Sequence, residues 1–322
     1  MAVDRSRLRA VGADPHFRFP SIARHRLANG LDVRTVEHRS VPVISLVVQV
    51  NDGSGADPVD RHGLAPISAE MLDEGTGSLS AIEVSEGLAQ IGGEFDIDVA
   101  PDATIFSLTT LTRFADRGAS LFADILVRPS LREEDFTRVR QMRLDRLRQL
   151  RDLPPAVAER AFLRLLYRDH PYGHLPIGSD AALRAMNVDD VRRFHGRAYR
   201  PSRATIVVGG DMSHAELRNG AERAFGSWSD DGVAARTVAA ATIDPAFVGD
   251  TRLAVVPREA AAQSELRIGH LTTGRDTPDY PGLLVLNAVL GGQFVSRVNL
   301  KLREEKGYTY GARTGFDWRR GI

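Results

Sequence analysis

Histidines at helical spacing are the first candidates for chemistry in this chain of 322 residues. His170 and His174 are four residues apart, the spacing at which two imidazoles on one helical face can bind a metal ion. Pro171 and Gly173 lie between them and disfavour a helix, so we expect no metal site there. The sequence contains no cysteine, which excludes thiolate zinc sites, cysteine nucleophiles and disulfides together.

Paired carboxylates are the second candidates. Glu70 and Glu74 share one face of a helix that we predict over residues 63–74. Two carboxylates without a nearby histidine are more typical of a solvated helix face than of a catalytic pair. The same interpretation applies to the arginine-rich helix expected at residues 138–151, whose alternating apolar positions favour an amphipathic surface over an RNA-binding one.

Length and charge limit the class of protein. A chain of 322 residues favours two domains, and a 43% hydrophobic composition is typical of a globular protein. Lys and Arg number 42, as do Asp and Glu, so the basic excess of a nucleic-acid-binding protein is missing. We predict no membrane span, since no stretch approaches about 18 uncharged apolar residues. The first residues lack the apolar core of a signal peptide, which favours the cytoplasm unless a leader was removed, in which case the periplasm is possible.

The elements of the first domain alternate between strand and helix patterns. Residues 1–26 are expected to form an N-terminal arm, and the turn at Asn29 and Gly30 predicts a hairpin. Capping boxes at Ser80 and at Ser213 predict two helix starts. Strands are expected at residues 41–50, 94–100, 103–111 and 203–209, and further helices at 114–126, 133–150, 155–168 and 188–198. This order predicts an α+β layered domain over residues 27–231, with a mixed, mostly antiparallel sheet packed against helices.

A second unit follows a linker expected at residues 232–250. Strand patterns at residues 252–256 and 264–271 precede a turn and an apolar helix at 283–290 that ends on Gly291 and Gly292. A Gly-Leu pair opens the apolar helix in both units, so the pattern predicts duplicated domains. Residues 251–322 contain less than half of such a copy, and we expect the second domain to be truncated and to leave apolar surface exposed.

Residues 63–76 read GLAPISAEMLDEGT and closely resemble the zinc helix of the insulinase (pitrilysin) family, the inverzincins. That helix has the pattern G-L-A-H-x-x-E-H-M-L-x-x-G-T, in which two histidines bind zinc and the glutamate activates water. The three matching positions here are Pro66, Ala69 and Glu70. The third zinc ligand of the family, a glutamate, aligns with Arg146, beside Asp145. The resemblance therefore implies that this chain binds no metal and that zinc belongs to a partner subunit.

Residues 291–311, GGQFVSRVNLKLREEKGYTYG, resemble the second-domain signature of the same family. In that signature an arginine and a tyrosine face the zinc site of the other domain, and they match Arg303 and Tyr310. Both side chains can donate hydrogen bonds to a scissile carbonyl as it becomes an oxyanion. Tyr308 is the rival of Tyr310, because strand alternation places both on one face. The signature's glycine-rich loop contacts substrate, although Gly291 and Gly292 also suit a helix C-cap. Further landmarks of the family lie at residues 27–31, 127–129, 169–173, 199–201 and 208–211.

Some bacterial members of this family work as paired subunits, one with H-x-x-E-H and the other with the Arg/Tyr pair. The resemblance implies that this chain is the second kind, a non-catalytic subunit that binds peptide and donates Arg303 and Tyr310 in trans to a zinc-bearing partner. A purely structural homologue is the alternative. A further alternative is an active peptidase with a relocated metal site at His62, Glu70 and Glu74, which is disfavoured because His62 precedes the helix.

Overall fold

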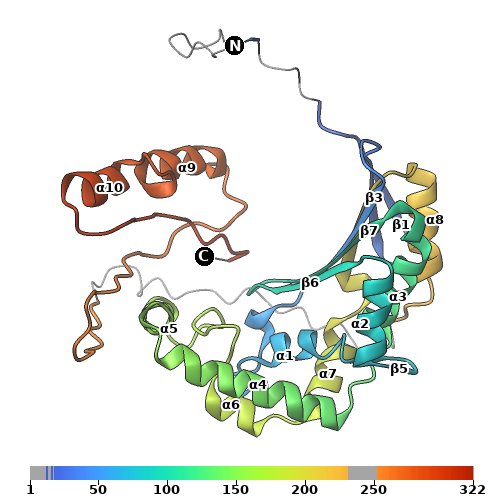
Figure 1. Ribbon diagram of the computed structural model, residues 1–322, viewed down its shortest axis with the longest axis horizontal. Helices are drawn as coiled ribbons and strands as arrows, with labels where there is room; N and C mark the ends of the chain where they lie inside the picture. The colour runs from blue at the N-terminus through green and yellow to red at the C-terminus, as the bar shows by residue number, and fades with distance from the viewer. Residues whose placement is uncertain (1–11, 14–15, 17, 231–251, 322) are drawn as a thin grey trace, which may run out of the picture.

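The computed structural model describes residues 12–13, 16, 18–230 and 252–321 (Figure 1). A six-stranded sheet organises the first unit, in the order β1-β2-β8-β3-β7-β6. Its strands are β1 (Ile22–Arg26), β2 (Asp32–Glu37), β3 (Val43–Val50), β6 (Glu94–Val99), β7 (Thr104–Leu111) and β8 (Ala204–Gly210). Neighbours are antiparallel except β2 and β8, which run parallel. The mixed sheet expected from the sequence is confirmed.

Eight helices cover this unit within the described residues: α1 (Leu64–Glu70), α2 (Ala81–Gln90), α3 (Ala115–Val127), α4 (Glu133–Arg151), α5 (Pro154–Tyr167), α6 (Asp180–Ala185), α7 (Val188–Ala198) and α8 (His214–Phe225). Helices α2, α3 and α8 lie on the outer side of the sheet (Figure 1). Strand alternation explains this arrangement, because Ile44, Leu46 and Val48 of β3 are buried while the side chains between them are only half-buried. The core therefore lies between the sheet and its helices.

Both predicted capping boxes are present. Ser80 and Ser213 each accept a hydrogen bond from the backbone N–H three residues on, and Glu83 and Glu216 bond back. A third box, at Asn187 before α7, and the short helix α6 were not predicted. The predicted N-terminal arm also differs in part, because its last residues, Ile22–Arg26, form β1 and pair with β2 as one side of the hairpin.

Helix α1 is shorter than the predicted 63–74, since it ends at Glu70. Gly63 precedes it with a φ of 101°, a left-handed conformation that a side chain would strain. A Cβ at Gly63 would also lie 3.0 Å from the Cα of Gly178, so the loop before α6 packs directly against the start of α1.

The second segment contains no strand among residues 252–321. Its ordered elements are α9 (Tyr280–Asn287), a π-helical turn at Ala288–Gly292, α10 (Arg297–Asn299) and a second π-helical turn at Leu300–Glu305. The strands predicted at residues 252–256 and 264–271, and the strand expected to carry Tyr310, are therefore wrong. A strand needs a hydrogen-bonded neighbour, and Leu253 and Ile268 are 87% and 93% exposed. The predicted linker at residues 232–250 lies outside the described residues.

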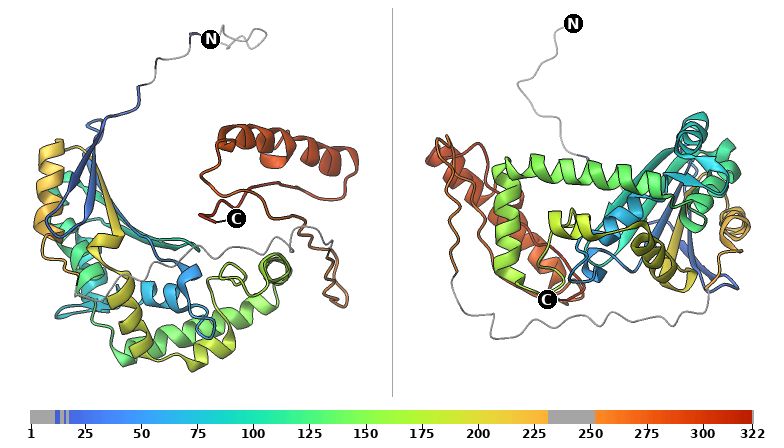
Figure 2. Two further views of the ribbon diagram at one scale, coloured as in Figure 1. Left: turned by 180° about the vertical axis from the view of Figure 1, so that it is seen from behind. Right: turned by 90° about the horizontal axis from the view of Figure 1, so that it is seen from below.

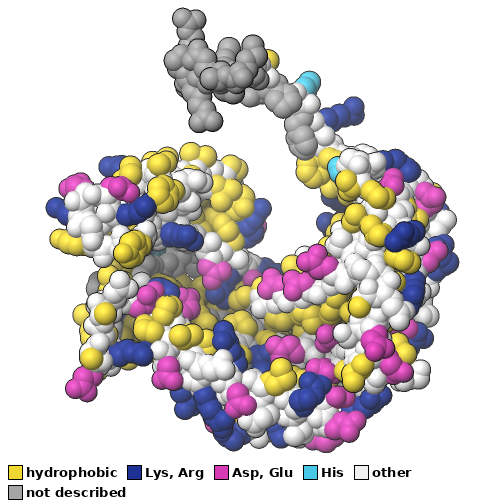
Figure 3. Space-filling view, viewed as in Figure 1, with side chains coloured by type: hydrophobic (Ala, Val, Ile, Leu, Met, Phe, Trp, Pro, Cys, Tyr) yellow, Lys and Arg dark blue, Asp and Glu magenta, His cyan; other side chains and the backbone are white. Residues whose placement is uncertain are grey.

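The extended chain before α9 runs along α5 (Figure 2). The Arg267 Nε donates to Glu159 Oε2 at 2.9 Å, and a Cβ at Gly269 would lie 2.8 Å from the ring of Phe162. Hydrophobic side chains gather on the surface over α9 and the residues after it (Figure 3), where Val285, Val289 and Val295 are 66%, 55% and 72% exposed. The expected exposed apolar surface is thus present, on helical residues. The incomplete second sheet that was expected to expose it is absent from residues 252–321.

One helical run, Tyr280–Glu305, is long and apolar enough to cross a membrane by length and composition alone, with 26 residues and a hydropathy of 1.3. A single run of this kind is weak evidence for a span. The backbone is extended at Gln293, which divides the run, and five of its last nine residues carry charge. The expectation of no membrane span stays a prediction.

Candidate functional site

Helix α1 carries the three positions that match the family's zinc motif. Pro66 is the third residue of the helix, where a missing N–H costs no intrahelical hydrogen bond. Pro66 and Ala69 are buried, so their side chains contribute packing only. Glu70 is the one ionisable group of the three, and its side chain is 46% exposed.

An arginine from α4 meets Glu70. The Arg143 Nη1 donates to Glu70 Oε1 at 2.6 Å, and its Nη2 donates to the carbonyl oxygen of Pro176 at 2.9 Å. The Arg143 side chain is only 6% exposed, and its buried Nε has no hydrogen-bond partner among the described residues. Arg143 therefore joins α1, α4 and the loop between α5 and α6.

Arg146, which the resemblance assigns to the third zinc position, lies one helical turn after Arg143 on α4, and that assignment stays a prediction. Arg146 is exposed and donates to Gln149 on its own helix at 3.2 Å. The buried residues of α4 are Phe136, Val139, Arg143, Leu144 and Leu147, and residue 146 is not among them. Asp145 is also exposed and pairs with Arg148 at 2.5 Å. The residue of α4 that faces the degenerate motif is Arg143.

A second ion pair between these helices lies beyond the end of α1. Arg138 binds Glu74 and also Asp135, the latter at 3.3 Å. Between the two carboxylates of Glu70 and Glu74, burial raises the pKa of Asp73 to about 6, and the neighbouring charges of Glu74 and Glu70 add to that rise. The carboxylates of this region therefore serve ion pairing with α4.

The start of α1 is held by a buried carboxylate that the sequence analysis did not single out. Asp57 accepts hydrogen bonds from the backbone N–H groups of Gly63 at 2.6 Å and Ala65 at 2.7 Å. His174 Nε2 lies 3.2 Å from its Oδ2, and the His174 ring stacks on His62. The predicted helix at residues 63–74 has no capping residue at its start, and Asp57 lies six residues before it. This combination could have identified Asp57 from the sequence.

These contacts determine whether the residues at and around α1 can bind a zinc ion. No group of three His, Cys, Asp or Glu side chains that could bind a metal converges within residues 12–230 and 252–321 that are described. His62 is engaged with His174, and Glu70 and Glu74 are engaged with arginines. A cationic guanidinium beside Glu70 opposes a metal ion. The residues present therefore do not fit zinc, and the relocated site at His62, Glu70 and Glu74 is not formed.

Arg303 lies in the second π-helical turn and is partly enclosed. Its guanidinium carbon stands 4.1 Å from the centre of the Phe294 ring, and its Nε lies 3.5 Å from Glu304 Oε1. Its Nη1 is buried and, within the described part of the chain, has no hydrogen-bond partner. The guanidinium thus keeps donor capacity that its own neighbours do not use.

Tyr308 and Tyr310 follow on an extended stretch, with 77% and 92% of their surface exposed. Asn299 holds this stretch, because its Nδ2 donates to the Phe294 carbonyl at 2.6 Å and its Oδ1 accepts from the Ala312 N–H at 3.0 Å. Both tyrosine side chains are therefore exposed to solvent, and the hydrogen bond to Asn299 fixes the backbone two residues after Tyr310.

Gly291 packs against the chain just after this stretch, and Gly292 packs against its own helical run. A Cβ at Gly291 would lie 2.4 Å from Thr314 Oγ1, and one at Gly292 would lie 2.7 Å from Asn287 Nδ2. The Thr314 N–H donates to the Gly291 carbonyl at 3.2 Å. Close packing thus accounts for both glycines, and their expected contact with substrate stays a prediction.

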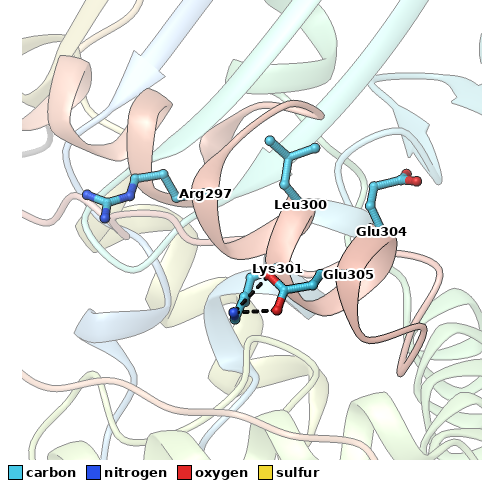
Figure 4. A pocket seen from close by; sticks show the side chains of 5 residues that line it. All are labelled: Arg297, Leu300, Lys301, Glu304 and Glu305. Atoms are coloured by element: carbon cyan, nitrogen blue, oxygen red, sulfur yellow. Dashed lines mark hydrogen bonds and ion pairs between the residues drawn. The ribbon is translucent and has the colours of Figure 1, made fainter.

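An open hollow lies along the same helical run (Figure 4). It is lined by Arg297, Leu300, Lys301, Glu304 and Glu305, and Lys301 Nζ donates to Glu305 Oε1 at 2.6 Å across it. This internal ion pair neutralises the only lysine of the hollow. Arg303 and Tyr310 do not line it.

An arginine clamp joins the two segments of the chain. The Arg319 guanidinium is buried, 5.2 Å from the Tyr167 ring centre and 4.8 Å from that of Tyr172. The Tyr172 hydroxyl donates to Asp102 at 2.5 Å, and the Arg320 N–H donates to the same carboxylate at 2.7 Å. The loop between α5 and α6 thus contacts both the degenerate motif and the second segment.

Two family models match the chain. One, described as "Insulinase (Peptidase family M16)", matches residues 33–178, and the other, described as "Peptidase M16 inactive domain", matches residues 185–322. The chain is 28% identical over 294 residues to an "Uncharacterized zinc protease" of Mycobacterium tuberculosis, covering 91% of this chain and 66% of the relative. It is 24% identical over 291 residues to one of Bacillus subtilis, covering 90% and 68%. The chain thus spans about two thirds of the length of these relatives.

Solved structures share the fold. A peptidase M16 inactive domain from Pseudomonas fluorescens superposes with a TM-score of 0.78 at 23% identity, covering 94% of this chain and 72% of that one. A protease from Helicobacter pylori gives 0.82 at 22% identity, with 94% and 73% covered. The matched family models, the relatives and these folds agree, and the chain belongs to the insulinase family of peptidases, M16.

Proposed function

We propose that this chain is a non-catalytic, substrate-binding subunit of a two-subunit zinc peptidase, and that it donates Arg303 and Tyr310 in trans to the zinc site of a catalytic partner. One observation carries the proposal. The zinc positions of α1 hold Pro66, Ala69 and a Glu70 neutralised by Arg143, while the Arg/Tyr signature is intact. The family model named for the inactive domain, which matches residues 185–322, supports the coarser part of this assignment.

The geometry of the second segment suits binding across an interface. Tyr310 is 92% exposed, and Arg303 has an unused donor although its ring contact with Phe294 holds it in place. An exposed phenol, and a guanidinium with a donor that its internal partners leave unused, can donate to the carbonyl oxygens of an extended peptide. In the assembled enzyme the partner supplies the zinc, the general base and the water. This chain supplies the hydrogen-bond donors and one wall of the chamber.

The test is reconstitution. The chain is produced alone and together with a family member that carries an intact H-x-x-E-H motif, and an internally quenched fluorescent peptide is assayed with and without chelator. We expect no cleavage by the chain alone and chelator-sensitive cleavage by the pair. Zinc-dependent cleavage by the lone chain would contradict the proposal.

Point variants of the reconstituted pair separate catalytic from structural roles. Arg303→Ala and Tyr310→Phe should each lower kcat/KM by about 100-fold, the usual loss when one oxyanion donor is removed. Arg297→Ala, an exposed arginine on the same helical run, is the matched control for loss of charge. Tyr308→Phe distinguishes the two tyrosines. Full activity of both Arg303→Ala and Tyr310→Phe would favour the structural homologue instead.

A further inference from the structure

The chain around Tyr310 is anchored to the helical run on both sides of that residue. The Tyr308 N–H, two residues before it, donates to the Leu302 carbonyl at 3.0 Å. The Ala312 N–H, two residues after it, donates to Asn299 Oδ1 at 3.0 Å. Tyr310 therefore lies midway along a short span whose two ends are tied to the same helical run.

The second anchor is a buried side chain that makes a further contact. Asn299 is 5% exposed, and its Nδ2 donates to the Phe294 carbonyl at 2.6 Å. The Phe294 ring in turn lies 4.1 Å from the guanidinium carbon of Arg303. One carboxamide thus connects the residue whose ring supports Arg303 to the backbone that follows Tyr310.

An asparagine suits this position chemically. A carboxamide carries both a donor and an acceptor, whereas a carboxylate lacks the donor and an aliphatic side chain lacks both. Because Asn299 is buried, its loss would leave the Ala312 N–H and the Phe294 carbonyl without these partners. The same burial means that Asn299 acts through the residues it holds, and not by direct contact with a peptide.

We propose that Asn299 is a positioning residue that holds Arg303 and Tyr310 as one unit. The inference rests on the proposed function, because the site that Asn299 orders is the Arg/Tyr pair. Asn299 lies four residues before Arg303, about one helical turn away, so the backbone after Tyr310 is fixed beside the turn that carries the arginine. A displacement of about 1 Å at a reacting centre can cost about 100-fold in rate, which gives this tether a catalytic effect.

The first test uses the kinetics of the reconstituted pair, at saturating partner. Asn299→Leu should lower kcat at least about 10-fold and leave KM within about 2-fold, because oxyanion donors act in the transition state. In the Arg303→Ala/Tyr310→Phe background the same substitution should lower kcat no further, since the groups that it displaces are already absent. A loss that multiplies in that background, or an unchanged kcat in the parent pair, would overturn the positioning role.

An asparagine of the first unit supplies the matched control. Asn29 Nδ2 donates to the carbonyls of Phe225 and Trp228 at 2.8 Å and 2.9 Å, and its Oδ1 accepts from the Leu31 N–H at 3.1 Å. Asn29→Leu therefore removes a comparable set of hydrogen bonds away from the Arg/Tyr pair. It should lower the urea midpoint and leave kcat unchanged. Equal losses of kcat for Asn29→Leu and Asn299→Leu would show a general effect of stability instead.

A conservative variant keeps the test open if Asn299→Leu does not fold. Asn299→Asp retains the acceptor for the Ala312 N–H and loses the donor to the Phe294 carbonyl. Its loss of kcat should be smaller than that of Asn299→Leu. Relative to the unmodified pair at each pH, its activity should rise as pH falls, because the protonated acid regains a donor. A relative activity that does not change with pH would contradict the contact with Phe294.

Hydrogen exchange of the lone chain separates this inference from the proposed function. Asn299→Leu should speed exchange several-fold at residues 308–312, and Asn29→Leu should not. This measurement needs no partner, so it decides whether Asn299 holds the tyrosine stretch even if the pair proves inactive and the proposed function fails. Unchanged exchange at residues 308–312 would overturn the inference. Activity that is lost in Arg303→Ala but kept in Asn299→Leu would reject the positioning role and leave the proposed function intact.

Discussion

The imidazole rings of His62 and His174 lie face to face, with centroids 4.0 Å apart and planes 4° from parallel. His62 immediately precedes the turn into α1, and His174 belongs to the loop between α5 and α6. Asp57 lies against His174 and caps the same helix. The stacked histidines and Asp57 therefore attach the start of α1, the helix with the degenerate zinc motif, to the loop between α5 and α6.

Removal of the Asp57 carboxylate should destabilise the fold. Asp57→Ala leaves the buried N–H groups of Gly63 and Ala65 without acceptors, which should lower the free energy of unfolding by about 1 to 3 kcal/mol. Urea denaturation measures the change. Asp60→Ala, an exposed neighbour, is the control, and equal losses for the two variants would show that the cap contributes nothing.

Acidification should weaken the fold through His62. Burial, and then the charge of His174, lower the pKa of His62 below its usual 6.5. The unfolded chain therefore binds the proton first, and the contribution of His62 to stability, which is complete above pH 6.5, is lost as pH falls through the folded pKa. His62→Gln should make the urea midpoint depend less steeply on pH between 7 and 5. The exposed His38→Gln should not alter the slope.

Asp73 should have the opposite pH dependence. Its folded pKa of about 6 exceeds the usual 3.8, so the native state binds the proton more tightly and loses stability as pH rises from about 4 to 6. Asp73→Asn should therefore stabilise the chain at pH 7, by on the order of 1 kcal/mol after allowance for its partial exposure. The gain should vanish below pH 4. A gain that persists at pH 3.5 would point to a cause other than charge, and the exposed Asp96→Asn is the comparison.

Loss of the Arg319 clamp should free the second segment. Arg319→Ala removes the guanidinium from between the Tyr167 and Tyr172 rings, a contact of about 1 to 2 kcal/mol when desolvated. Limited proteolysis should then cut residues 252–321 several-fold faster, and hydrogen exchange should rise there but not in the first unit. The variant of an exposed arginine, Arg313→Ala, should be cleaved at the original rate. Identical cleavage rates for the two variants would show that Arg319 does not hold the second segment.

Local signals in the sequence were sufficient for most of the first unit. The capping boxes at Ser80 and Ser213 and the strand expected at residues 41–50, which contains β3, are encoded within a few residues, and each appears where it was predicted. Helix α6 was missed because six residues carry too little periodicity. The strands after residue 251 failed for the opposite reason: their composition suits a strand, but strand formation depends on neighbours that the described chain does not offer.

The candidate site was predictable where it rests on a motif. The replacement of the motif residues follows from Pro66, Ala69 and Glu70 directly, whereas the burial of Arg143 and the exposure of Arg146 depend on the rotation of α4. A buried arginine among Phe136, Val139 and Leu147 could have been identified from helical spacing, since position 143 falls on the same face and position 146 does not. The contact of His174 with Asp57 and the contacts of Arg319 join residues far apart in the chain, which no local pattern reveals.

The position of β8 in the sheet has a consequence for biogenesis. β8 pairs with β2 on one side, where Asp32 lies opposite Thr205, and with β3 on the other. Until β8 is synthesised, the hairpin of β1 and β2 and the three strands β3, β7 and β6 are two separate sheets with unpaired inner edges. During synthesis the helices can therefore form early, but the sheet cannot close until residue 210 has left the ribosome. A translational pause before that point would hold the nascent chain in its most aggregation-prone form.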